Sequence, residues 1–127
     1  MGLARMRMVP HALDLPRSEA AETALRAIEQ WVEMGNWINF RATAQYAIAL
    51  LGGAGRFEAA VRIHGYLDGF VGNAAPAIRQ RIDDALSAAI DALGDSASRR
   101  LEAGRLSTNA EMGSYLADEL RSLRLGR

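Results

Sequence analysis

The sequence predicts an all-α fold made of stacked antiparallel helical hairpins. Apolar residues recur at helical spacing along most of the 127 residues, and no stretch alternates polar and apolar side chains as a half-buried strand does. Short joints rich in glycine or proline separate the apolar stretches. The stretch 37–67 is apolar on more than one face, so its helices need neighbours on both sides, as the inner helices of a repeat array do.

Composition limits both the size and the chemistry of the protein. A chain of 127 residues that is 50% hydrophobic and 24% charged fits one globular domain, which we place at 18–127 behind an N-terminal arm, 1–17. The 15 basic and 15 acidic residues cancel, which disfavours nucleic acid and anionic membranes as partners. No apolar run approaches the roughly 18 residues of a membrane span, and the arm is too interrupted for a signal peptide.

Two missing residue types exclude further functions. Every basic residue is arginine, so phosphate-binding loops and Schiff-base or Ser-Lys catalysis, which depend on a lysine, cannot operate. The absence of cysteine removes disulfides, thiolate nucleophiles and cysteine-based zinc sites. It also suits a reducing compartment, and we therefore expect a cytoplasmic protein.

Two helices are predicted in the first half of the chain. The first begins at Ser18, the expected N-cap, and stops at the Gly35-Asn36 turn. The second, over 37–51, is apolar around most of its circumference, which is typical of a central buried helix. Its apolar positions are Ile38, Phe40, Ala44, Ala47, Ile48, Leu50 and Leu51.

A helix over 56–71 follows the glycine-rich joint 52–55 and carries two apolar stripes, so it should pack on two partners. One stripe is Phe57, Ala60, Val61, His64, Leu67 and Val71, and the other is Ala59, Ile63, Tyr66 and Phe70.

Three more helices are predicted after Pro76. Proline suits the first helical position, and the amphipathic pattern that follows it ends at Gly94. A short helix over 97–103 comes next. Thr108, with Glu111 three residues later, is the signature of a capping box that opens a last helix over 109–123.

The hairpin carries a family resemblance. Gly55 is followed two positions later by Phe57 and three after that by Ala60, as at the start of the second helix of a tetratricopeptide hairpin, with Trp37 and Leu51 in the first helix. Together with the run 101–107 and Glu111, the stretch 18–124 resembles the C-terminal helical-repeat segment of large bacterial regulators, namely LuxR-type transcription factors with an ATPase and cyclase-linked ATPases. This resemblance implies a short tetratricopeptide-like array with a C-terminal helical cap and a regulatory context.

Each candidate chemical site has a simpler structural explanation, which we favour. His64 falls on an apolar stripe and is expected to be an interior histidine rather than a metal ligand or catalytic base. The joint 52–55 precedes a helix N-terminus, where anions can bind, but turning the chain explains its glycines. The remaining candidates are expected to be solvated or part of the hairpin core: Asp83, Asp84, Asp91, Arg99, Arg100, Arg105, Trp31 and Trp37.

We therefore expect a non-enzymatic module that needs no cofactor or metal and binds a protein partner, most simply a second copy of itself. The expected interaction surface consists of apolar residues of the arm and of the exposed end of the array: Leu3, Met6, Met8, Val9, Leu13, Leu25, Ile28, Val32, Ile63, Tyr66 and Phe70. Two alternatives stay open. One is a small-ligand pocket near Trp31, Trp37, His64 and Tyr66, and the other is a component of a DNA-associated transcriptional regulator that acts through its arginines.

Overall fold

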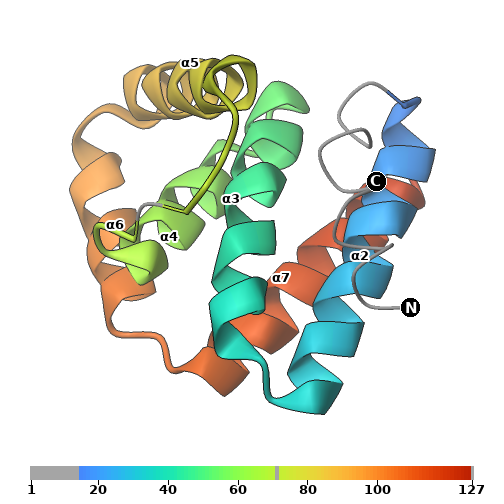
Figure 1. Cartoon of the computed structure of the whole chain (residues 1–127). Coiled ribbons are helices and arrows are strands. Elements are labelled where there is room, and N and C mark those ends of the chain that lie inside the picture. Colours follow the sequence, from blue (N-terminus) through green and yellow to red (C-terminus); the bar gives the residue numbers. More distant parts are fainter. Residues whose placement is uncertain (1–14, 71, 127) are drawn as a thin grey trace.

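The computed structural model describes residues 15–70 and 72–126, and within these ranges the fold is all-α, as predicted. The elements are α2 (Arg17–Met34), α3 (Trp37–Gly53), α4 (Phe57–Leu67), α5 (Pro76–Leu93), the 3₁₀ turn η1 (Gly94–Ser96), α6 (Ala97–Arg105) and α7 (Asn109–Arg124). Helices α2 and α3 run antiparallel, and α5 lies crosswise to α3 at the top of the view (Figure 1).

The hairpin of α2 and α3 turns at the Gly35-Asn36 stop, as predicted. Gly35 adopts the left-handed conformation with φ 68°, and the Asn36 side chain accepts a hydrogen bond of 3.1 Å from the backbone N–H of Asn39. The expectation of an N-cap at Ser18 is wrong. Pro16 occupies the N-cap position of α2 without a side-chain hydrogen bond, because α2 already begins at Arg17.

Helix α3 is the central buried helix, as its apolar circumference indicated. It packs on α2, α4 and α5, and Phe40, Ala44 and Leu51 have no exposed surface. A buried hydrogen bond of 3.0 Å, from Trp31 Nε1 to Thr43 Oγ1, ties α3 to α2. Satisfying both polar groups in the core removes the penalty of burying them unpaired.

Helices α4 and α6 cross with their backbones close together. An added Cβ at Gly65 would overlap the carbonyl oxygen of Leu101, and one at Gly104 would overlap the carbonyl oxygen of Arg62. The two backbones can approach this closely only because both positions lack a side chain. Helix α4 is also shorter than predicted, because Asp68 and Gly69 turn the chain with φ values of 43° and 88°.

The C-terminal helices match their sequence signals. Pro76 opens α5, and the exposed positions of α5 include Asp83, Asp84 and Asp91. Both hydrogen bonds of the predicted capping box are present at the start of α7, at 3.1 Å from Glu111 N–H to Thr108 Oγ1 and 2.8 Å from Thr108 N–H to Glu111 Oε1.

Helix α7 packs along α2, which brings the two ends of the described chain together (Figure 1). The expectation that Leu25 and Ile28 would lie at an uncovered end of the array is therefore wrong. Leu25 is 2% exposed and Ile28 is 0% exposed. The buried face of α7, with Met112, Leu116 and Leu120, joins them in the core.

Candidate protein-binding site

A groove with a volume of about 500 Å³ runs between α2 and α7. Its floor is mainly apolar, and its rim carries charged side chains on both helices. The lining residues are Ile28, Glu29, Val32, Glu33, Trp37, Ala110, Gly113, Ser114, Ala117, Asp118 and Arg121.

Small residues on α7 create the groove. Ala110, Gly113 and Ala117 lie three and four positions apart, so they share one face of the helix. A Cβ at Gly113 would meet Val32 Cγ2 at 3.2 Å, so a larger side chain there would partly fill the groove. Trp37 forms one wall and is supported by an edge-to-face contact with Phe40, with ring centroids 5.2 Å apart.

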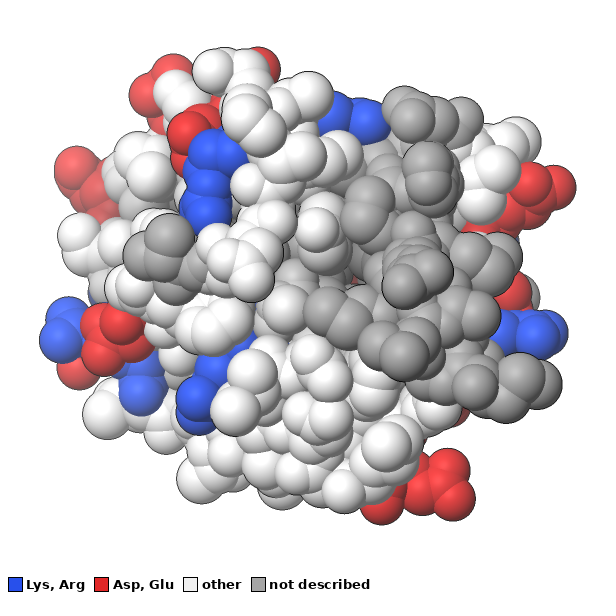
Figure 2. Space-filling model, viewed as in Figure 1, with Lys and Arg blue, Asp and Glu red and all other residues white. Residues whose placement is uncertain are grey.

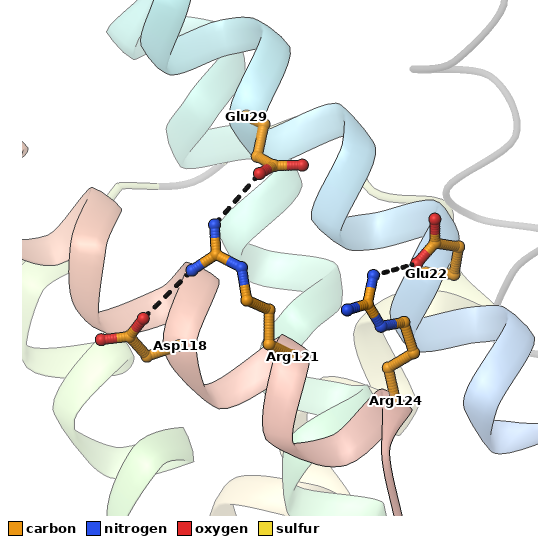
Figure 3. A network of polar contacts seen from close by, with 5 residues as sticks. All are labelled: Glu22, Glu29, Asp118, Arg121 and Arg124. Carbon is orange, nitrogen blue, oxygen red and sulfur yellow. Dashed lines mark hydrogen bonds and ion pairs between the residues drawn. The ribbon is translucent and has the colours of Figure 1, made fainter.

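Ion pairs bridge α2 and α7 along their seam (Figure 3). Arg121 on the groove rim contacts Glu29 at 3.1 Å and Asp118 at 3.1 Å, and Arg124 reaches Glu22 at 2.7 Å. Hydrogen bonds from Arg124 and then from Arg26 lower the pKa of Glu22, because both guanidinium groups favour the ionised carboxylate. These pairs are partly exposed, so each contributes little to stability but helps to orient the side chains along the seam.

An exposed apolar corner adjoins the groove where α2 turns into α3. Val32, Met34 and Ile38 are exposed by 37%, 60% and 72%. Sequence reasoning included Val32 in the interaction surface, but it omitted Met34 and assigned Ile38 to a buried helix. Ile38 lies in the first turn of α3, two residues after the N-cap Asn36, and this position at the end of the helix was the available signal.

The other predicted interaction residues divide into three groups. Leu3, Met6, Met8, Val9 and Leu13 lie outside the described residues. Leu25, Ile28, Ile63 and Tyr66 are buried within the chain, and Phe70 is half-buried. Val32 and Ile28 therefore both border the groove, Ile28 as part of its buried floor, whereas Leu25, Ile63 and Tyr66 pack inside the fold.

The residues of the alternative ligand pocket occupy different surroundings. Trp31 is buried and bonded to Thr43, Trp37 lines the groove, and the Tyr66 hydroxyl donates to Asn109 Oδ1 at 2.6 Å. The expectation of an interior histidine is wrong, because His64 is exposed. It borders a separate hollow of about 210 Å³ whose lining also includes Gln45, Arg79 and Asp83.

Other charged and titratable groups are engaged in contacts within the fold. Arg100 pairs with Glu58 at 2.9 Å, and Arg105 lies 3.7 Å from Asp68. Burial raises the pKa of Tyr115 to about 12, and the Arg62 guanidinium lies 4.1 Å from the centre of that ring. On the face drawn in Figure 2, basic and acidic side chains lie near one another at the margins, and uncharged residues fill most of the described area between them.

The described residues contain no group of three histidine, aspartate or glutamate side chains placed to hold a metal ion. None of the helices in the described ranges is long and apolar enough to cross a membrane. No protein-family model, curated protein sequence or solved structure matched the chain. Any assignment of function therefore depends on the surface itself.

Proposed function

We propose that this chain is a non-enzymatic interaction module that binds protein, and in particular a second copy of itself, through the α2–α7 groove and the adjoining corner. The observation that carries the proposal is the apolar floor of the groove together with the exposed residues at its end, where Val32 lines the groove and Met34 and Ile38 lie at the neighbouring α2–α3 turn. An apolar groove with a charged rim is typical of protein interfaces, whereas isolated exposed apolar residues are common on any protein.

The regulatory setting belongs to the same proposal. A tetratricopeptide-like stack in a bacterial, cytoplasmic regulator would use such a surface to assemble with other copies or with neighbouring helices. Its support is the resemblance of the hairpin around Gly55 and Phe57, together with a composition free of cysteine.

Two glutamate substitutions, at residues whose side chains are exposed to a similar extent, test the proposed self-association. Ile38→Glu places a charge on the corner, and Leu106→Glu places the same charge at a residue exposed by 74% elsewhere, compared with 72% for Ile38. By light scattering at tens of micromolar, we expect the wild-type protein and the Leu106 variant to be dimers and the Ile38 variant to be a monomer. A wild-type monomer, or equal effects of the two substitutions, would reject the proposed interface.

A further inference from the structure

The charge of the groove rim restricts what can occupy it. Glu29, Glu33 and Asp118 supply three carboxylates and Arg121 supplies one guanidinium, which leaves a net charge of −2 around the groove. The single guanidinium already contacts Glu29 and Asp118. Two copies joined groove to groove would bring like charges together, which is unfavourable at an interface. The groove therefore favours an occupant that is both apolar and basic.

The chain itself carries a segment of this kind. Residues 1–13 contain Arg5 and Arg7 and no aspartate or glutamate. The apolar residues among them are Leu3, Met6, Met8, Val9 and Leu13, together with Met1 and Ala4 and Ala12. Methionine side chains adapt to irregular apolar surfaces, so this composition suits an open groove whose floor is made of small residues.

The arrangement of the seam favours an arm from another molecule. The arm joins its own α2 at Arg17, whereas the groove lies beside Glu29 and Glu33, roughly 18–24 Å farther along the helix at 1.5 Å per residue. Between the two places the Arg124–Glu22 pair crosses from α7 to α2, whereas the Arg121–Glu29 pair stands on the groove rim itself (Figure 3). To reach the groove of its own molecule, the arm would have to fold back along α2 and pass over the Arg124–Glu22 pair. An arm from a second copy does not need to follow that path.

We propose that residues 1–13 of one copy occupy the α2–α7 groove of a second copy, where the positive charges of Arg5 and Arg7 complement the acidic rim. This inference rests on the proposed self-association and adds the identity of the occupant. Each copy supplies one arm and one groove, so the exchange is reciprocal and closes as a two-fold dimer.

A charge swap in the full chain tests the exchange. Arg7→Glu and Glu33→Arg each place like charges at the contact, and the contact occurs twice in the dimer. We expect each variant alone to raise the dimer dissociation constant about tenfold or more. Asp91→Arg, at an exposed position on α5, is the matched control and should leave the constant unchanged.

An equimolar mixture of the two variants restores opposite charges at both contacts of a mixed dimer. The acidic arm of the Arg7→Glu variant meets the basic rim of the Glu33→Arg variant, and at the other contact the arm and the rim both keep their wild-type charges. We expect the mixture to return to within about twofold of the wild-type constant.

Sedimentation equilibrium on the wild type, the three charge variants, Ile38→Glu and the mixture separates the outcomes. Rescue by mixing requires contact between two molecules and supports the arm exchange. If Ile38→Glu abolishes the dimer while Arg7→Glu has no effect, the interface stands and the arm is not its occupant. If the wild-type chain is a monomer, both the self-association and the exchange are rejected.

Discussion

Two helix pairs in this fold are built in opposite ways. Helices α4 and α6 cross with their backbones almost touching, at Gly65 and Gly104, and leave no space for a side chain. Helices α2 and α7 are also extensively packed, but their outer margin is lined by small residues and bridged by exposed ion pairs. The first pair is closed by backbone geometry, whereas the second leaves a groove. The comparison indicates that glycines in one fold can have unrelated roles, which graded substitutions should reveal.

The largest expected effect is at the α4–α6 crossing. Gly104→Ala places a methyl group against the Arg62 carbonyl oxygen and 2.8 Å from the Tyr66 backbone nitrogen, and a backbone cannot move aside as a flexible side chain can. We expect a loss of about 3 kcal/mol or more in the free energy of unfolding, measured by urea denaturation.

Gly53→Ala is the control for this substitution, because nothing lies within 4 Å of the added methyl group. It should change stability by less than about 1 kcal/mol, in the stabilising direction expected from helix propensity. Similar losses for the two variants would show that the backbones do not meet at Gly104.

An intermediate effect is expected where α3 meets α5. Gly52→Ala brings a methyl group to 2.7 Å from the Ala85 Cβ and to 3.4 Å from the Ala85 carbonyl oxygen, so the overlap is smaller than that with the Arg62 carbonyl oxygen at Gly104. We expect a loss of about 1–2 kcal/mol by the same assay. The double variant Gly52→Ala/Ala85→Gly removes the contact and should recover part of that loss, and the absence of any recovery would contradict the proposed contact.

Gly113→Ala should have a smaller effect, because the groove can accept the change. The closest atom to the added methyl group is the end of the Val32 side chain, at 3.2 Å, the Trp37 and Phe40 rings lie at the ordinary contact distances of 3.9 and 4.0 Å, and α7 gains helix propensity. We expect stability to stay within about 1 kcal/mol of the wild type, while the narrower groove weakens dimer formation in sedimentation experiments. A loss as large as that of Gly104→Ala would remove the distinction between the two helix pairs.

The sequence predicted local structure better than it predicted which faces are covered. Helix ends were predictable where the residue that starts or stops the helix contacts only residues near it in the sequence. This is the case at Gly35, at Pro76 and at the Thr108–Glu111 capping box. Burial depends on distant segments. His64 shares one stripe of α4 with Val61, and Val61 is buried. Because α4 ends at Leu67 and packs closely on α6, His64 is left exposed beside an open hollow.

The groove was not predicted because its two walls are far apart in the sequence. Val32 was predicted to belong to the interaction surface from the pattern of α2 alone, whereas Gly113 and Ala117 form a groove with it only because α7 lies on α2. No short sequence pattern predicts the contact between α2 and α7, and a repeat array would place the first and last helices at opposite ends of the stack. The same missing contact explains why Leu25 and Ile28 were expected to be exposed.

The smallest expected effect concerns the ion pairs of the α2–α7 seam. The pKa of Glu22 is lowered in the fold by Arg124 and Arg26, so the fold is stabilised at pH values above the unfolded-state pKa of Glu22, near the ordinary 4.5. That contribution is lost as the pH falls through the lower folded-state pKa. Because the pair is partly exposed, we expect it to contribute about 0.5 kcal/mol or less to the free energy of unfolding, and less at high salt.

The pKa of Glu111 is also lowered, through the capping box, so acid unfolding of the wild-type protein alone cannot isolate the contribution of Glu22. Urea unfolding of the wild type and of Glu22→Gln between pH 6 and pH 3 isolates it by difference. The two free energies should converge toward acid pH, and a gap that stays constant with pH would show that Glu22 acts through packing rather than through its charge.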